Sequence, residues 1–287
     1  MKKLKESRAS SFTIIAVIYI LTAFLGIIIY NLLDFSFYIN LLIADVAATA
    51  FTFLFSLIFR NASVYDPYWS VQPPVILVAL LTRHGVTAAG LTVTVAVSLW
   101  AIRLTANWAY TFGNLTHQDW RYTMLHEKCG RAYPLVNFVG IHLVPTLVVY
   151  LCTLPAAFVI YYAWDFSPIA LVGIALSLFA TALQCISDIQ MHKFRKNRTT
   201  PFIRTGLWKY SRHPNYLGEI LMWWGVGIFA VILMPSYYLL LGGAVANTLL
   251  FAFVSIPMAD KRQAKKEGFE EYKRKTRVLL PLPKSVR

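Results

Sequence analysis

Charged residues are scarce in this chain: Asp, Glu, Lys and Arg make up 14% of its 287 residues, against 57% for hydrophobic residues. Soluble proteins carry about 25% charged residues. The scarcity therefore excludes an ordinary soluble protein, and no stretch of the sequence has the composition of a soluble domain. We expect an all-α integral membrane protein with no soluble domain.

Signatures of metal, redox and classical nucleotide sites are also missing. The three cysteines, Cys129, Cys152 and Cys185, lack metal or redox spacing and are expected to be small packing residues. His117 and His126, with scattered acids near them, form too weak a pattern for a metal site, so we predict no metal. No Gly-x-Gly-x-x-Gly follows a strand, which excludes a Rossmann domain.

Long apolar runs are abundant, and they predict about 7–8 transmembrane helices, because about 20 apolar residues cross a bilayer. The runs lie near residues 11–33, 38–59, 72–83, 86–106, 136–162, 168–190, 217–234 and 238–258. The third is too short for a full crossing. The first follows a basic start but lacks a small-residue cleavage site, so it predicts a retained span and not a signal peptide.

Positive charge is distributed unevenly. The chain has 27 Lys and Arg against 13 Asp and Glu, and if all eight runs cross, only Arg83 lies on the side opposite the others. The positive-inside rule then places both termini in the cytoplasm of a multi-pass protein. The membrane would be the bacterial inner membrane, or the endoplasmic reticulum if the chain is eukaryotic. The charge predicts contact with anionic membrane lipids and not with nucleic acid, and nothing indicates an obligate protein partner.

The polar segments divide the chain into three regions. Residues 1–106 hold the N-terminal transmembrane helices and the expected substrate region, residues 107–135 form a cytoplasmic loop, and residues 136–287 form a C-terminal cofactor-binding domain. The later loops and the tail all lie on the predicted cytoplasmic face, where they can converge on one site.

Polar residues gather where one of the last spans ends. Gln184, Asp188 and Arg195 fall four and seven residues apart, which puts them on one helix face. A carboxylate in an apolar span needs a partner. Asp188 either pairs within its helix, for example with His192, or accepts hydrogen bonds from a nucleotide.

Seven cations follow within twenty residues, and they match either the phosphates of a dinucleotide or simple topogenic charge. These are Lys193, Arg195, Lys196, Arg198, Arg204, Lys209 and Arg212.

The run from Gly206 to Gly225 places cations and a carboxylate at the mouth of an apolar helix. Arg212 and His213 precede Pro214, a residue suited to the first helical turn, and Asn215 and Glu219 lie one turn apart on the same face. A helix N-terminus favours an anionic or carbonyl oxygen. A carboxylate this deep in an apolar helix indicates a binding site.

These residues resemble the steroid 5α-reductase C-terminal superfamily. The resemblance rests on Ser187-Asp188, on Gly-Leu-Trp-Lys-Tyr-Ser-Arg-His-Pro-Asn-Tyr-Leu-Gly-Glu at 206–219, and on Phe269-Glu-Glu-Tyr272 with Arg277-Val-Leu-Leu-Pro281. Within this superfamily the sequence of these motifs is most similar to the DUF1295 group of membrane proteins. The resemblance covers roughly residues 180–285. It implies an NADPH-dependent reductase of a lipophilic conjugated enone, such as a steroid. It also implies cofactor contacts from Gln184, Asp188, Arg195, Arg204, Arg212, His213, Asn215, Glu219 and Arg262.

The N-terminal half departs from the superfamily pattern, in which a Gln-Glu pair and a Tyr bind the substrate ketone. Asp66 stands where the Glu is expected, Tyr65 replaces the Gln, and the Tyr has no clear counterpart. The candidate catalytic groups are therefore Asp66, protonated by burial, or the phenols of Tyr65, Tyr68 or Tyr110. Asp66-Pro67 could equally be a helix cap and first-turn proline.

Two other functions compete with the reductase. Arg212-His-Pro-x-Tyr-x-Gly and the Glu-Glu-Tyr272 tail also resemble membrane methyltransferases of the isoprenylcysteine carboxyl and phospholipid type, which use S-adenosylmethionine. A non-enzymatic lipid-binding or transport protein is the third alternative, although the chain lacks the internal repeats typical of transporters.

Overall fold

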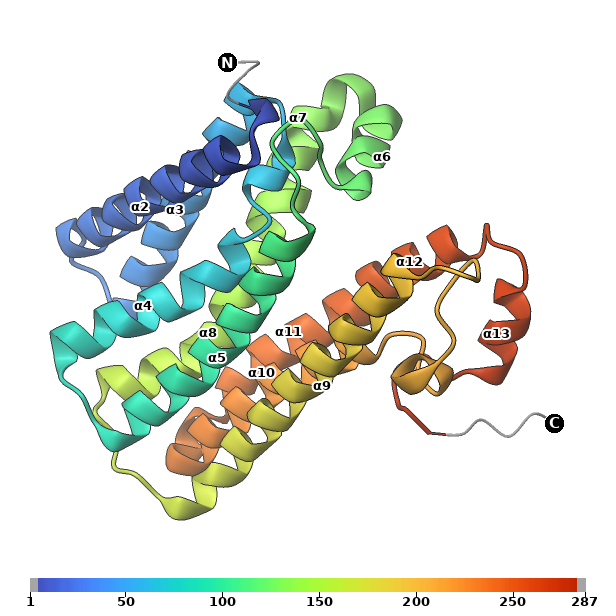
Figure 1. Cartoon of the computed structure of the whole chain (residues 1–287). Coiled ribbons are helices and arrows are strands. Elements are labelled where there is room, and N and C mark those ends of the chain that lie inside the picture. Colours follow the sequence, from blue (N-terminus) through green and yellow to red (C-terminus); the bar gives the residue numbers. More distant parts are fainter. Residues whose placement is uncertain (1–4, 283–287) are drawn as a thin grey trace.

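Helices make up the regular structure of the computed structural model, which describes residues 5–282 (Figure 1). The longer helices are α2 (Arg8–Leu32), α3 (Phe37–Phe59), α4 (Tyr68–His84), α5 (Ala88–Thr111), α8 (Val144–Tyr161), α9 (Leu171–Lys196) and α10 (Pro214–Leu233). The shorter ones are α6 (Trp120–Cys129), α7 (Tyr133–Val136), α11 (Gly242–Leu250), α12 (Ile256–Gln263) and α13 (Phe269–Lys275). Within this range the only β-pairing is a single bridge between Ser211 and Arg277, so the predicted all-α class is confirmed.

Seven helical segments of the described chain are long and apolar enough to cross a membrane. They are Arg8–Leu32, Phe37–Phe59, Ala88–Thr111, Trp120–Tyr161, Pro168–Lys196, Pro214–Leu233 and Pro235–Gln263. Two of them are continuous through π-helical segments, Asn137–Leu143 between α7 and α8 and Phe251–Ser255 between α11 and α12. The expected short span corresponds to α4, whose 17 residues reach only about 25 Å at about 1.5 Å per residue. The prediction of a multi-pass membrane protein is confirmed.

The helices bring most loops and both ends of the described chain to one end of the bundle, which we call the basic end. There the Asn114 amide donates to the backbone of Glu6 at 2.9 Å, and the His192 ring contacts Asn107 at 2.7 Å. The basic end holds residues 5–7, 60–67, 112–119, 197–213 and 264–282. Among the described Lys and Arg residues, only Arg83 lies at the opposite end. The structure thus places the Lys and Arg residues as the sequence predicts, with Arg83 apart from the others. The side of the membrane that the basic end faces stays a prediction.

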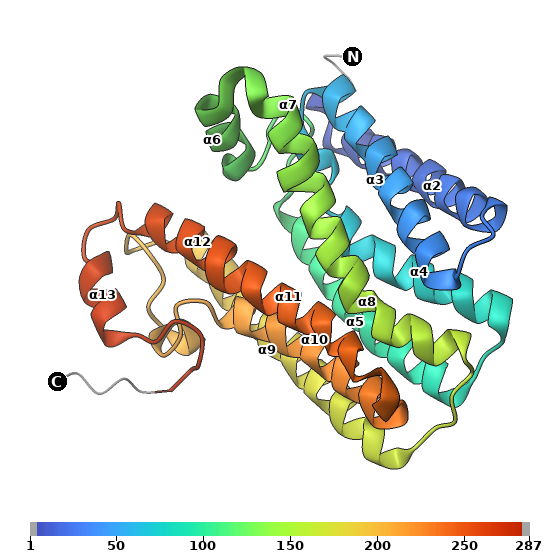
Figure 2. The same cartoon turned by 180° about the vertical axis from the view of Figure 1, so that it is seen from behind.

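The four C-terminal helices α9 to α12 form one tightly packed group, shown in yellow to red (Figures 1 and 2). Small residues allow the close approach of α9 and α10. A Cβ on Gly218 would lie 2.7 Å from the Ala180 carbonyl oxygen, and one on Gly225 would lie 2.5 Å from that of Gly173. No larger residue fits there without separating the helices, so the spacing of this group is fixed by its sequence.

Helices α2 and α3 lie on the other side of the molecule, and α5 and α8 stand between them and the C-terminal group (Figures 1 and 2). Helix α5 packs against both α4 and α9. The molecule is therefore layered, with an N-terminal layer of α2, α3 and α4, a middle layer of α5 and α8, and the C-terminal group.

Candidate functional site

Arg103 on α5 is the centre of a buried ion cluster that joins three helices. Its Nη1 lies 2.7 Å from Asp188 Oδ2 on α9, and its Nη2 lies 3.7 Å from Glu219 Oε2 on α10. The Arg103 side chain is only 12% exposed. Asp188 thus pairs across the bundle with α5. It does not form the pair with His192 in its own helix that was one of the two interpretations of the sequence. Two buried carboxylates sharing one guanidinium form the kind of cluster that an apolar environment tolerates only when its charges are paired.

Glu219 is held from two further directions by indole groups. Trp100 Nε1 donates to Oε2 at 2.9 Å, and Trp223 Nε1 donates to Oε1 at 3.1 Å. Both tryptophans are almost fully buried, and their rings meet edge to face at 4.8 Å. Both oxygens of the Glu219 carboxylate are therefore occupied within the protein. These contacts hold the Glu219 carboxylate in one fixed position.

A cleft of about 260 Å³ opens above this cluster at the basic end, between α9, α10, α12, α13 and the start of α6. Six of the nine predicted cofactor residues line it: Asp188, Arg195, Arg212, His213, Asn215 and Arg262. Gln184 and Glu219 are buried below it, and Arg204 lines a second hollow of about 370 Å³ together with Lys209 and Lys275. The two hollows meet at Tyr272, which lines both.

Asp260 fixes two of the basic side chains that line the cleft. It accepts from Arg212 Nη2 at 2.9 Å and contacts His213 Nε2 at 2.9 Å. Arg212 Nη1 also donates to the Thr276 carbonyl at 2.9 Å, and the His213 ring stacks on Tyr216. Arg212 and His213 therefore tie the start of α10 to α12 and the tail, and their polar groups are largely occupied.

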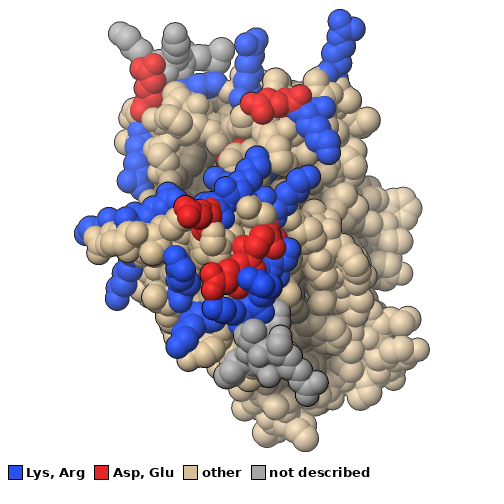
Figure 3. All heavy atoms as spheres, turned by 90° about the vertical axis from the view of Figure 1, so that its right-hand side faces the viewer, with Lys and Arg blue, Asp and Glu red and all other residues tan. Residues whose placement is uncertain are grey.

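Arg195 and Arg262 face the cleft without an ion-pair partner within residues 5–282. The Arg262 guanidinium lies 4.1 Å from the centre of the Trp120 ring, a cation–π contact between α12 and α6. Arg204 lies over Phe202 in the adjoining hollow. Figure 3 shows Lys and Arg side chains crowding this part of the surface around a few acidic groups, while much of the same face is uncharged.

Several buried polar atoms around the cleft have no hydrogen-bond partner among residues 5–282. Asn215 Oδ1 and Gln263 Oε1 belong to residues that line the cleft, and both amide atoms of Gln184 are unpaired just beneath it. Buried amide groups are nearly always hydrogen-bonded. The cleft thus places unpaired acceptors beside arginines without ion-pair partners, groups that are chemically suited to a polar, anionic ligand.

The four candidate catalytic residues have different partners, although the rings of Tyr65 and Tyr68 stack on each other at 5.2 Å. Tyr65 OH bonds Thr146 at 2.7 Å inside the bundle, and Tyr68 OH donates to Asp45 at 2.8 Å in the N-terminal layer. Asp66 accepts from the Tyr122 hydroxyl on α6 and does not cap α4, which begins after Pro67 without a side-chain cap.

Tyr110 is the only one of the four that adjoins the cleft. Its ring lies 4.6 Å from that of His192, a residue that lines the cleft, and the Tyr110 side chain is largely exposed. The four groups therefore do not form one catalytic cluster in this structure, and Tyr110 alone is placed to meet a ligand of the cleft.

Asp66 gives the protein a pH-dependent stability that can be measured. Burial raises the pKa of the Asp66 carboxyl from 3.8 to about 6, although the Arg121 cation and the Tyr122 hydroxyl act in the opposite direction. Between these two pH values the folded state holds a proton that the unfolded state has released, so stability falls as pH rises and is constant above this window. We expect a loss of about 1–2 kcal/mol between pH 4 and 7, which is less than the full pKa difference implies because Asp66 is partly exposed. Asp66→Asn should flatten the profile, and an unchanged slope in thermal unfolding would contradict the assignment.

Three central residues escape sequence reasoning: Arg103, Trp100 and Asp260. In the sequence, Arg103 is one basic residue at the end of an apolar run, and only its spacing of three residues from Trp100 indicates a shared helix face. Asp260 stands among the charges of the tail. Nothing in the sequence indicates that these residues meet Asp188, Glu219 and Arg212.

A known protein family matches most of the chain. The profile of the family described as "Protein of unknown function (DUF1295)" matches residues 52–276. An uncharacterized protein of Schizosaccharomyces pombe is 24% identical over 249 residues, which cover 74% of this chain and 69% of the relative. No solved structure matches the chain. The profile spans the cleft, the ion cluster beneath it and most of the bundle, and the chain belongs to the DUF1295 family.

Proposed function

We propose that the protein is an NADPH-dependent membrane reductase of the C=C bond of a lipophilic conjugated enone, a 3-oxo-Δ4 steroid or a related lipid. The main support is the cleft at the mouth of α10, where free arginines stand beside buried amide oxygens that lack partners. Guanidinium groups suit phosphates, and unpaired buried acceptors favour a ligand with amide or hydroxyl donors. The resemblance of residues 206–219 to the steroid 5α-reductases supports NADPH as this ligand.

Residues of the two adjoining hollows would bind different parts of NADPH. Arg195 and Arg262 in the cleft, and Arg204 next to it, would bind the phosphates. Asn215 and Gln263 would accept hydrogen bonds from amide or hydroxyl groups. Glu219 acts as a positioning residue, since it fixes Arg103 and thereby Asp188, whose carboxylate lines the cleft.

The reaction needs a donor that strengthens its hydrogen bond as enolate charge develops on the substrate. When bound, NADPH would supply a hydride to the β-carbon of the enone. Tyr110 is the candidate donor beside the cleft, and its exposed ring at the end of α5 is accessible to a substrate arriving from the bilayer. Because the Tyr110 side chain is exposed at the basic end, water can return a proton to the phenol after it has donated one.

Arg195→Gln should weaken NADPH binding about tenfold, because one charge-assisted contact to phosphate contributes at least about 1.4 kcal/mol. Isothermal titration of the purified protein measures the effect. Lys193→Gln removes a nearby cation of α9 that does not line the cleft, so it should leave the affinity unchanged. Equal effects from both variants would mean that only the general positive charge matters.

Thermal unfolding with each cofactor tests the function itself and separates it from its rivals. NADPH, but not S-adenosylmethionine, should raise the unfolding temperature, and the NADPH-bound protein should oxidise the cofactor when given a steroid or polyprenal enone. Stabilisation by S-adenosylmethionine alone would favour the methyltransferase. Stabilisation by neither would favour a non-enzymatic lipid-binding protein.

A further inference from the structure

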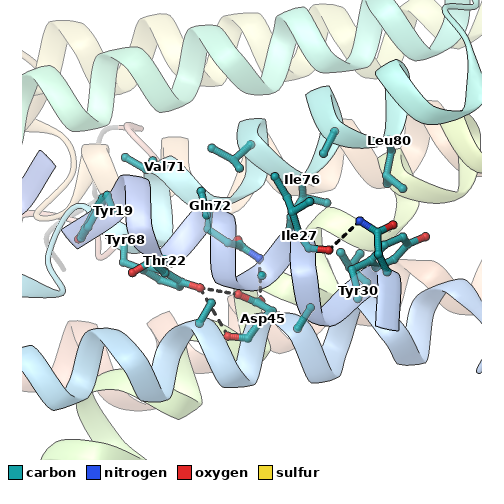
Figure 4. Close-up of a pocket in the computed structure, with 18 of the residues that line it drawn as sticks. Tyr19, Thr22, Ile27, Tyr30, Asp45, Tyr68, Val71, Gln72, Ile76 and Leu80 are labelled. Atoms are coloured by element: carbon teal, nitrogen blue, oxygen red, sulfur yellow. Dashed lines mark hydrogen bonds between the residues drawn. The ribbon is translucent and has the colours of Figure 1, made fainter. Parts of the chain in front are cut away.

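A second cavity of about 280 Å³ lies in the N-terminal layer, away from the cleft (Figure 4). All of its lining residues belong to α2, α3 and α4. The cleft is lined from α9 and α10, and α5 packs between α4 and α9. The cavity volume is near the lower end of the range for ligand sites, about 300–1,000 Å³. A ligand held here would be separated from the proposed hydride donor by a layer of helices.

The inner end of the cavity is polar and is built around Asp45. Tyr68 OH donates to Asp45 Oδ1 at 2.8 Å, and Gln72 Nε2 donates to Oδ2 at 2.7 Å (Figure 4). Asp45 is 4% exposed, and within residues 5–282 no Lys, Arg or His lies within 4 Å of its oxygens. Both of its bonds come from neutral groups. A carboxyl group in a bilayer-spanning helix without a cation is costly, and such residues are typically functional.

The walls and the outer end of the cavity suit a lipid. Side chains such as Ile27, Val75 and Ile76 make the walls apolar, and Arg83 lies at the outer end beside Asn31. Gln72 and Arg83 are 11 residues apart on α4, which is about 16 Å along the helix. The cavity therefore has the proportions of one alkyl chain or fused-ring body, with a polar group required at its inner end.

We propose that this cavity binds one amphiphile from the bilayer, whose amine or hydroxyl group donates a hydrogen bond to Asp45. A carboxylate has about four acceptor positions, and Tyr68 and Gln72 use two of them. A donor or cation from the ligand supplies what the buried carboxylate lacks. The cavity is lined by α2, α3 and α4 alone, and the cleft by other helices. This site is thus distinct from the proposed reductase site and does not depend on it.

Photo-crosslinking in nanodiscs tests the proposal with the full-length protein. The probes are dodecylamine and dodecanol carrying a chain diazirine, with the corresponding dodecyl methyl ether as a probe that cannot donate. We expect the amine or the alcohol to label peptides of α2 and α4, and the ether to label them about tenfold less. Preference between the first two identifies the polar group. Equal labelling by the ether, or labelling confined to other helices, would overturn the proposal.

Two variants locate the site. Gly26 lines the cavity, and its Cβ would meet only ordinary contacts at 4.0 Å, so Gly26→Leu fills the cavity without a clash at the helix. It should reduce labelling about tenfold, whereas Gly140→Leu, at an exposed glycine outside the cavity, should not.

Asp45→Asn should reduce labelling by the amine about tenfold and by the alcohol less, because the amide oxygen still accepts. NADPH stabilisation is measured on the same samples and should be unchanged in both the Gly26 and Asp45 variants. If NADPH fails to bind the wild type while Asp45-dependent labelling persists, the reductase proposal fails and this one stands. Undiminished labelling of the Gly26→Leu variant would refute the proposal that the cavity binds the amphiphile.

Discussion

Replacing Arg103 by Met will lower the unfolding temperature by about 10 °C, the largest effect that we expect from a single substitution. Breaking a buried ion pair leaves an uncompensated charge and costs about 3–5 kcal/mol. Here two carboxylates lose their cation at once, since Arg103 serves both Asp188 and Glu219. The indole groups of Trp100 and Trp223 still bond Glu219, so the loss will fall most heavily on Asp188.

Two further substitutions separate charge from packing in this experiment. Arg103→Lys keeps the cation but not the planar fork that reaches two partners, so it should fall between the wild type and Met. Arg131→Met makes the same chemical change at an exposed residue of the 130–132 turn and should shift the midpoint by less than about 2 °C. A similar small shift for Arg103→Met would show that the cluster does not stabilise the bundle.

Asp260→Ala is the second large effect that we expect, and it will release the C-terminal tail. The Arg212 side chain is 6% exposed, and without Asp260 its remaining bonds are to backbone carbonyls. His213 loses its partner as well. We expect about 3 kcal/mol of destabilisation and much faster tryptic cleavage within residues 261–275, a segment rich in Lys and Arg.

The matched control for this experiment is Glu270→Ala. Its ion pair with Lys273 is exposed and long, at 3.9 Å, so its contribution to stability is small. Cleavage of this control should follow the wild type. If Asp260→Ala also follows the wild type, then Asp260 does not hold the tail against α10.

The sequence predicts the helices far better than it predicts the contacts of the site. Apolar run length locates the spans, and the spacing of Asn215 and Glu219 places them on one face of α10. Trp223 is a neighbour of Glu219 on α10, but its other partners, Trp100 and Arg103, come from α5, more than one hundred residues away, and depend on how the helices pack. Asp66 illustrates the opposite difficulty: it follows Tyr65 in the chain, but the two side chains bond α6 and α8 respectively. Chain neighbours diverge because the backbone turns between α3 and α4.

The single bridge between Ser211 and Arg277 has a consequence for the order in which the molecule is assembled. The backbone N–H groups of Arg212 and His213 donate to the carbonyls of Arg277 and Val278 at 2.9 and 3.2 Å. Residues 269–278 therefore complete a wall of the cleft that α9 and α10 begin. During synthesis Arg212 and His213 leave the ribosome 65 residues earlier than Arg277 and Val278. A nascent chain thus carries an unfinished cleft, and this wall of the cleft is complete only when translation has passed Val278.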